Sequence, residues 1–315
     1  MPVDLTQYLT IAISSRALFK LDDEHQIFDQ KGPEEYERYQ IAHENKILDP
    51  GPGFPLVRAI LSLNSTKRKR AEVVIISRNN PSVALRIMNS IKEHKLDITR
   101  AAFTTGTPVS KYLDSFAVTL FLSRNEDDVR EALNNKIAAG LLYASPVNFE
   151  ESLDEIRVAF DGDAVIFSDE AERVYKKDGL DAFLKHEQVN ANKPLPEGPF
   201  AKLLKALSFL QKGSVKKDIK IRLGLFTARN SPAHERVIKT LRLWNVRIDE
   251  MFFLGGVSKH EVLKAFRPHI FFDDQQIHCM PASRVVPTAI VPTDYDVMDL
   301  KELGDKSKKN RDISE

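Results

Sequence analysis

The sequence contains a single cysteine, Cys279, among 315 residues. One thiol cannot form an intramolecular disulfide, so a disulfide framework is excluded and a reducing compartment is favoured. A charge excess is also lacking, since 46 Lys and Arg against 45 Asp and Glu leave a net charge of +1. That balance provides no overall field to attract nucleic acid or anionic lipid. No apolar run approaches the roughly 20 residues of a membrane span, and MPVDLTQYLT lacks the features of a secretory signal. We therefore expect a cytoplasmic protein that binds neither nucleic acid nor membrane.

The two halves of the sequence are similar in several segments that occur in the same order. IAISSRALF (11–19) parallels VAFDGDAVIF (158–167), SRNNPSVALRIM (77–88) parallels ARNSPAHERVI (228–238), and LFLSRNEDD (120–128) parallels IFFDDQQIH (270–278). The offset between matching segments stays between 146 and 151 residues. Chance similarity would not preserve both order and spacing, so we interpret the sequence as a tandem duplication with a boundary near residue 150.

Strand-like and helix-like segments alternate within each half. Apolar, β-branched runs at 72–77, 221–227 and 269–274 are typical of buried strands, and 231–245 has the spacing of a helix capped by Ser231. This alternation predicts parallel βαβ units and an α/β fold.

The expected organisation is a first half at 1–150, a second half at 151–298 and a polar tail at 299–315. An insert at about 168–200 follows the first strand of the second half and reads as two short helices. It is too polar to be core. We expect it to form a small helical cap over the strand ends.

Acidic side chains follow two of the predicted strands in the second half. Asp161 and Asp163 stand at i and i+2, which places both on one side of an extended chain, and Asp273 and Asp274 end another apolar run. In parallel sheets, ligands bind at these carboxyl ends. One carboxylate there can attack a phosphoryl group and a second can act as general acid and base. The remaining pair suits Mg²⁺, which neutralises charge during phosphoryl transfer.

A hydroxyl and an amine complete this set. Thr227 ends the run at 221–227 and Lys259 stands at the start of SKHEVLKAF, so both are candidates to bind phosphate. Each element alone has an ordinary structural reading: a D-x-D pair is usually a solvated turn, and a lysine in a first helical turn is usually a solvated side chain. The ordered set of strand-DGD, strand-T, K and strand-DD is more specific than any of its parts.

This ordered set resembles the four motifs of the haloacid dehalogenase (HAD) phosphohydrolase superfamily, matched in turn by DGDAV, FTAR, SKHE and FFDD. Three longer segments are similar to the cytosolic 5'-nucleotidase I family: AFDGDAVIFSDEAERVY, NKPLPEGPF and IFFDDQ. The similarity covers most of the chain. The resemblance implies two HAD-like Rossmannoid units and Mg²⁺-dependent hydrolysis of a nucleoside 5'-monophosphate, typically AMP, through an aspartyl-phosphate. By position it implies Asp161 as nucleophile, Asp163 as general acid/base, Thr227 and Lys259 as phosphate-binding residues, and Asp161, Asp163, Asp273 and Asp274 around the metal.

Other readings of the second half remain open. The same core would serve a phosphatase for another small phosphate ester, such as a phosphosugar, and a regulator that binds nucleotides without turnover belongs to a different class. The cap offers Phe167, Tyr175, Phe183 and Phe200 to stack on a base, although packing is the commoner role for any one of them. A homo-oligomer is also left open.

The first half lacks the acids. Alignment of the two halves pairs each site residue of the second half with one of the first. Asp161 pairs with Ser14, Asp163 with Arg16, Thr227 with Ile76, Asp273 and Asp274 with Ser123 and Arg124, and Lys259 with Lys111. Without carboxylates there is neither nucleophile nor metal site, so we expect a non-catalytic copy. It is either a packing partner or a metal-free anion site for a regulatory nucleotide, formed by Ser14, Arg16, Arg78, Lys111 and Arg124.

Overall fold

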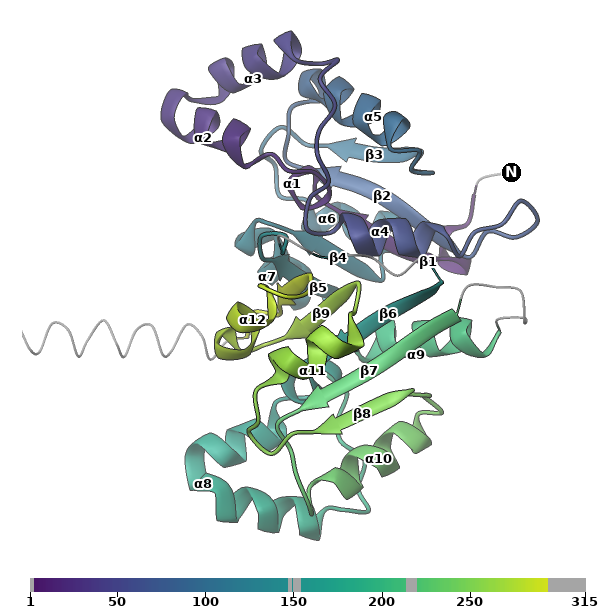
Figure 1. Cartoon of the computed structure of the whole chain (residues 1–315), viewed down its shortest axis with the longest axis vertical. Helices are drawn as coiled ribbons and strands as arrows, with labels where there is room; N and C mark the ends of the chain where they lie inside the picture. Colours follow the sequence, from purple (N-terminus) through teal and green to yellow (C-terminus); the bar gives the residue numbers. More distant parts are fainter. Residues whose placement is uncertain (1–2, 147–148, 150–153, 214–219, 294–315) are drawn as a thin grey trace, which may run out of the picture.

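Two sets of strands join in one sheet. The computed structural model describes residues 3–146, 149, 154–213 and 220–293. The strands of the first half are β1 (Leu9–Ile13), β2 (Ala71–Ser77), β3 (Arg100–Phe103), β4 (Leu120–Ser123) and β5 (Ala138–Leu142). Those of the second half are β6 (Glu155–Phe160), β7 (Lys220–Thr227), β8 (Glu250–Phe253), β9 (Ile270–Asp273) and β10 (Thr288–Ile290). Within the described residues they form a 10-stranded sheet in the order β3-β2-β1-β4-β5-β10-β9-β6-β7-β8 (Figure 1).

The strand order is the same in both halves when each is read inward from its outer edge. β3-β2-β1-β4-β5 corresponds to β8-β7-β6-β9-β10, and neighbouring strands within each half are parallel. The halves meet at β5 and β10, which are antiparallel. A Cβ added at Gly140 would lie 2.8 Å from Cβ of Ala289, so the missing side chain allows the two strands to approach. The result is an α/β fold built on a large, mostly parallel sheet.

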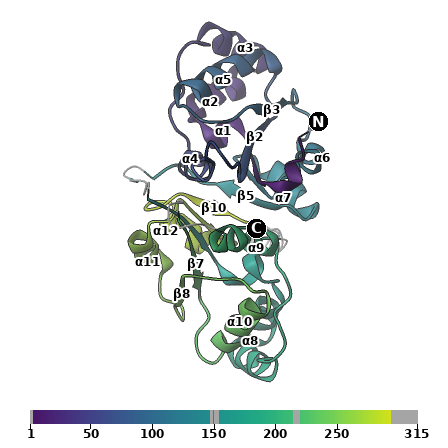
Figure 2. The ribbon, with the colours of Figure 1, turned by 90° about the vertical axis from the view of Figure 1, so that its right-hand side faces the viewer.

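Helices alternate with the strands in both halves. The first half contains α1 (Ser15–Leu18), α2 (Asp22–Lys31), α3 (Pro33–Ala42), α4 (Phe54–Leu61), α5 (Ala84–Glu93), α6 (Ser110–Leu113) and α7 (Glu126–Asn134). The second contains α8 (Glu170–Val189), α9 (Ala201–Lys212), α10 (His234–Leu243), α11 (Lys259–Phe266) and α12 (Gln276–Ala282). Figures 1 and 2 show α2 and α3 at one end of the molecule and α8 at the opposite end. α8 is interrupted at Gly179, whose φ of +80° suits glycine, so the insert contains two helical segments.

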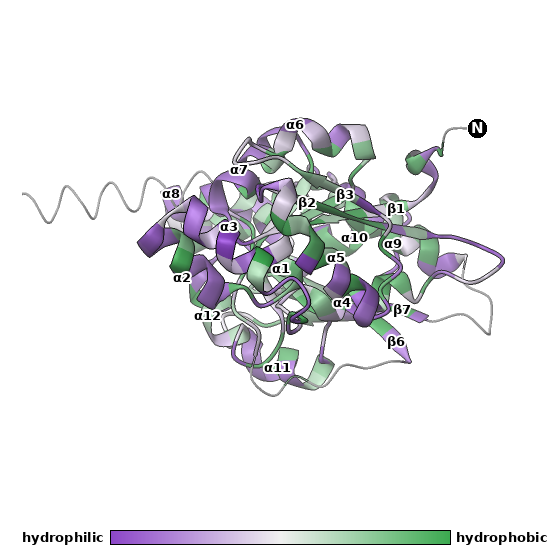
Figure 3. Cartoon of the chain, turned by 90° about the horizontal axis from the view of Figure 1, so that it is seen from above, coloured by the Kyte–Doolittle hydropathy of each residue, from purple (hydrophilic) through white to green (hydrophobic). Residues whose placement is uncertain are grey.

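The core is continuous between the halves. All residues of β2 are buried, as expected for a parallel strand covered on both faces. One apolar cluster includes Ile11 of β1, Leu142 of β5 and Phe272 of β9, so the halves share their interior. In Figure 3, β2 and β3 are largely apolar, whereas polar residues gather on helices such as α3. This shared interior holds the strand ends in fixed positions.

The predicted strands at 72–77, 221–227 and 269–274 are confirmed as β2, β7 and β9. The predicted start of the helix at 231–245 is wrong, because a turn at 231–233 precedes α10 and Ser231 is not its N-cap. None of the helices in the described ranges is both long and apolar enough to cross a membrane. The tail predicted at 299–315 lies outside the described residues.

Candidate active site

The predicted acids of the second half meet where three neighbouring parallel strands end. Asp161 directly follows β6, Thr227 ends β7, and Asp273 and Asp274 lie at the end of β9. The backbone N–H of Asp161 donates to the carbonyl oxygen of Phe272 at 2.8 Å, which fixes the end of β6 beside β9. All four polar side chains are buried. The adjacency of the strands therefore brings together residues that are far apart in the sequence.

Lys259 lies in the middle of this cluster. It is the first residue of α11 and only 2% exposed. Its Nζ donates to the carboxylate of Asp161 and, at 2.6 Å, to Oδ2 of Asp273. The second oxygen of Asp273 accepts from the backbone N–H of Gln275 at 2.9 Å. Asp161 and Asp273 are thus bridged by one buried ammonium group.

The cluster contains more carboxyl groups than cations to balance them. Burial raises the pKa of Asp161 to about 6, even though the attraction of Lys259 acts in the opposite direction. Burial also raises the pKa of Asp273 and, together with the charge of Asp273, raises that of Asp274 well above its ordinary value. Oδ1 of Asp274 is buried and accepts no hydrogen bond. Three carboxylates facing one ammonium leave a formal charge of −2 when all are ionised, which a further cation would balance.

The side chains do not form a ready-made metal centre. Among the described residues, no three histidine, cysteine or carboxylate side chains are grouped so that they could hold a metal ion. The Lys259 ammonium instead stands between Asp161 and Asp273. The unpartnered oxygen of Asp274 and the excess negative charge nevertheless fit a divalent cation with oxygen ligands.

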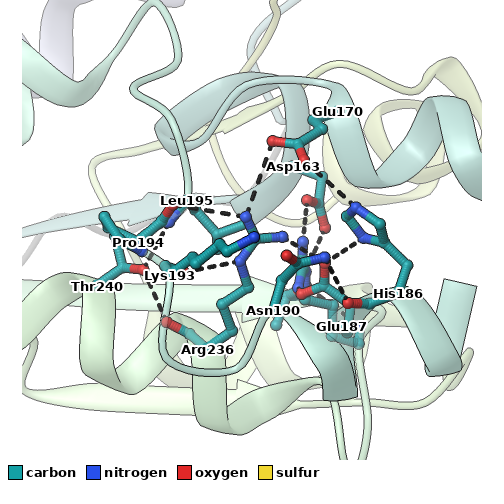
Figure 4. Close-up of polar contacts among 12 residues, drawn as sticks. Asp163, Glu170, His186, Glu187, Asn190, Lys193, Pro194, Leu195, Arg236 and Thr240 are labelled. Carbon is teal, nitrogen blue, oxygen red and sulfur yellow. Dashed lines mark hydrogen bonds and ion pairs between the residues drawn. The ribbon is translucent and has the colours of Figure 1, made fainter.

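Asp163 faces a different partner. The guanidinium of Arg229 donates to both of its carboxylate oxygens, at 2.7 Å and 2.6 Å. Arg229 also donates to Glu187 of α8, and Glu187 accepts from Arg236 at 2.8 Å (Figure 4). His186 lies 3.2 Å from the same carboxylate. A buried network of alternating charge therefore connects Asp163 to the inserted helix.

The sequence reading missed this network and a nearby carboxylate. Arg229 lies inside the quoted FTAR motif, which was the available signal, whereas nothing in the sequence singles out Glu187. Glu172, also on α8, accepts from Nε2 of Gln275 at 3.3 Å. Burial raises the pKa of Glu172, and the charges of Asp163 and Asp161 act in the same direction. The inserted helix therefore places a further acid close to the site.

The four aromatic candidates have different surroundings. Phe167 and Phe200 are completely buried in the main core, where Phe167 packs against Trp244 and Phe200 against Phe272. These two rings cannot stack on a ligand. Phe183 and Tyr175 contact one another edge to face at 6.2 Å between ring centroids, and Tyr175 is 51% exposed. They are the aromatic side chains that α8 offers.

Backbone contacts correct one alignment of the halves. In the second half, the backbone N–H of Leu254 donates to the carbonyl oxygen of Thr227. In the first half, the backbone N–H of Thr104 makes the equivalent bond to the carbonyl oxygen of Ser77. The hydroxyls of Thr227 and Ser77 accept from the N–H two residues on, at 3.2 Å and 3.3 Å. Ser77, not Ile76, therefore corresponds to Thr227. The first half keeps a hydroxyl at this position.

The counterpart of Lys259 also differs from the prediction. Ala117 and Arg267, both with left-handed φ near +50°, end the corresponding helical segments. Lys259 and Val109 stand at the same number of residues before these helix ends, so they correspond to one another. Val109 is fully buried. Lys111 is exposed and does not line the cavity formed by the other predicted residues of the first half.

The remaining predicted residues of the first half do come together. Ser14, Arg16, Arg78 and Arg124 line one cavity at the ends of β1, β2 and β4. Ser14 matches Asp161, since its N–H donates to the β4 carbonyl of Leu122 at 2.9 Å. Arg78 is neutralised by Asp128, to which it donates at 2.8 Å and 2.6 Å.

Comparison with known proteins places the chain in a family. The family described as 5'-nucleotidase matches residues 1–297. Human cytosolic 5'-nucleotidase 1B is 38% identical over 289 residues, which are 88% of this chain and 47% of the human protein. The chain thus spans about half the length of this curated relative, and no solved structure is significantly similar to it. Because the family match and the human relative both cover most of its residues, the chain belongs to the cytosolic 5'-nucleotidase I family.

Proposed function

We propose that the chain hydrolyses nucleoside 5'-monophosphates, AMP first among them, to nucleoside and phosphate. The observation that supports this most is the buried cluster of Asp161, Asp273 and Asp274 around Lys259 at the ends of adjacent parallel strands. The human relative is a cytosolic 5'-nucleotidase, which supports the same reaction and a cytoplasmic location.

The proposed reaction proceeds in two displacements. The Asp161 carboxylate attacks phosphorus and forms an aspartyl-phosphate, while the bond to the nucleoside oxygen breaks. Asp163 gives a proton to that leaving oxygen and then accepts one from the attacking water, which releases phosphate and regenerates Asp161. Lys259 and Thr227 bind the phosphate oxygens. Arg229 positions Asp163 through its paired hydrogen bonds, and Asp163 gives up one of them to reach the substrate.

We propose Mg²⁺ as the cofactor, with Asp161, Asp273 and Asp274 as the carboxylates that would hold it. Because these side chains are not grouped around a metal position and Lys259 stands between two of them, they would have to rearrange on binding. The excess negative charge around Lys259 and the unpartnered oxygen of Asp274 support this set. Bound Mg²⁺ supplies neutralising charge to the phosphate oxygens. Asp163, which the sequence also placed around the metal, is omitted because its carboxylate pairs with Arg229 and not with Lys259.

Both alternative functions are less well supported. A non-catalytic regulator has no need of three buried carboxylates, whose desolvation is costly. A phosphosugar phosphatase would use the same cluster, and the family match favours nucleotides over it. The exposed ring of Tyr175, on α8, supports a flat substrate.

We further propose that the two halves are duplicated HAD-like units and that α8 is the cap of the second. The common strand order supports the duplication. Equivalent tertiary contacts support it as well: Nε of Arg86 donates to the carbonyl of Lys46 at 2.9 Å, and Nε of Arg236 donates to that of Lys193 at the same distance. The proposed units are 1–150 and 151–298.

The Asp161→Asn variant is expected to release no phosphate above background, because an amide cannot form the aspartyl-phosphate. The measurement is phosphate release from a panel of nucleoside monophosphates and sugar phosphates in the presence of Mg²⁺. Asp181→Asn, which changes an exposed aspartate of α8, is the matched control and should keep the wild-type rate. Turnover by Asp161→Asn would exclude Asp161 as nucleophile, and hydrolysis of sugar phosphates alone would contradict the proposed substrate.

Excess chelator is expected to abolish phosphate release, and added Mg²⁺ to restore it, because a dianionic phosphate is otherwise repelled by the buried acids. Asp274→Asn should require a higher Mg²⁺ concentration for half-maximal activity, since it removes one proposed ligand. Activity that persists undiminished in chelator would show that the metal assignment is wrong.

Arg229→Met is expected to lower the free energy of unfolding by about 3–5 kcal/mol, because it leaves the buried carboxylate of Glu187 and that of Asp163 without this partner. Arg173→Met removes an exposed ion pair of α8 and should cost about 1 kcal/mol or less. Urea unfolding of both variants provides the comparison. Equal losses would mean that the network contributes no more than a surface pair.

A further inference from the structure

The first half contains a cavity of about 480 Å³ where the second half has its acids. Ser14, Arg16, Ser77 and Arg124 line it, and these residues follow or end β1, β2 and β4. A volume of this size is typical of small-molecule sites. The cavity therefore occupies the position at which parallel sheets bind ligands.

The sign of the charge is reversed between the two positions. In the second half, four carboxylates and two cations give a formal charge of −2; these are Asp161, Asp163, Asp273, Asp274, Lys259 and Arg229. The six corresponding positions of the first half contain two arginines and no acid, which gives +2; they are Ser14, Arg16, Ser123, Arg124, Val109 and Asn79. The cavity lining as a whole keeps a smaller positive excess, since Arg16, Arg78 and Arg124 stand against Glu37 and Asp128. Because Asp128 is paired with Arg78, the two arginines at the strand ends are the charges offered to an anion.

The polar groups of this cavity are incompletely paired. Oγ of Ser14 and Nε of Arg16 are buried and have no hydrogen-bond partner. Arg16 and Arg124 share one carboxylate, that of Asp22, at 3.6 Å and 3.5 Å, and this carboxylate is itself 43% exposed. Burial and the repulsion of Arg124 lower the pKa of Arg16 despite Asp22. Buried polar groups are normally satisfied, so these atoms indicate a missing partner that accepts hydrogen bonds.

Aromatic rings complete the cavity on the side of α2 and α3. Phe28 of α2 and Tyr36 of α3 both line it and meet edge to face at 5.8 Å between centroids. The ring of His25 stacks on Phe28 at 5.9 Å. Phe28 is 43% exposed, which is unusual for a ring that only fills a core. Such a surface suits a flat, apolar group.

We infer that the first half binds, without a metal ion, a phosphate ester that carries a flat ring, which is the chemistry of a nucleotide. The phosphate contacts Arg16, Arg124 and Ser14, and the ring lies against Phe28 and Tyr36. This site is separate from the proposed catalytic centre, and it does not depend on turnover by the second half.

Calorimetric titration in excess chelator tests the inference, with the Asp161→Asn protein as the reference so that no probe is hydrolysed. The probes are AMP, ribose 5-phosphate and adenosine. AMP should bind at one site per chain, ribose 5-phosphate more weakly because it lacks the ring, and adenosine weakest because it lacks the charge. Adding Arg16→Gln and Arg124→Gln should weaken AMP binding by at least about tenfold for each arginine removed.

Two further variants keep the result interpretable. Arg38→Gln changes an exposed arginine of α3 that does not line the cavity and should bind AMP normally. Ser14→Asp puts a carboxylate where the phosphate is expected and should prevent binding without removing either arginine. In a wild-type background, Arg16→Gln with Arg124→Gln should keep phosphate release with Mg²⁺, which shows that the chain is folded.

The inference is overturned if AMP shows no binding in chelator, if adenosine binds as tightly as AMP, or if the arginine and Ser14→Asp variants bind AMP as the reference protein does. None of these results bears on turnover in the second half. Failure of this site and failure of the proposed reaction are therefore distinguishable.

Discussion

One buried ammonium group determines the arrangement of the second half's strand ends. Lys259 bridges Asp161, after β6, and Asp273, at the end of β9, and without it two acids would face one another in the interior. Breaking such a pair by removing one partner leaves an uncompensated charge, which typically costs about 3–5 kcal/mol. A single positive charge still does not balance three carboxylates. The cluster therefore favours additional positive charge, which the proposed Mg²⁺ would supply.

The first half shows what the same scaffold becomes without the acids. The position that corresponds to Lys259 is the buried Val109. A valine is expected there, because a buried lysine without carboxylate partners would destabilise the folded protein. The hydroxyl position is retained as Ser77, and arginines stand at two of the acid positions, Arg16 and Arg124. The two halves thus share strand order, and the residues at their corresponding strand ends differ in the sign of their charge. In our proposals, a phosphate is bound with a metal ion in the second half and without one in the first.

The sequence predicted the parts of this arrangement that depend on local pattern. The strands β2, β7 and β9 follow from apolar runs, and the acids at the ends of β6 and β9 follow from the motif order. Arg229 and Glu187 were missed because their ion pair joins residues 42 positions apart, on different elements. Ile76 and Lys111 were matched wrongly because a shift of one or two residues is small in an alignment. In a strand, a shift of one residue reverses the face to which a side chain points.

The central claim is that phosphoryl transfer passes through Asp161 and no residue of the first half. Rapid acid quenching of wild-type protein with AMP and Mg²⁺, followed by peptide mass spectrometry, tests it most directly because it identifies the modified residue. The account predicts a transient phosphoryl group on Asp161 and an unmodified peptide around Ser14. A phosphoryl group on Ser14, or sustained turnover with Asp161 never modified, would contradict the account.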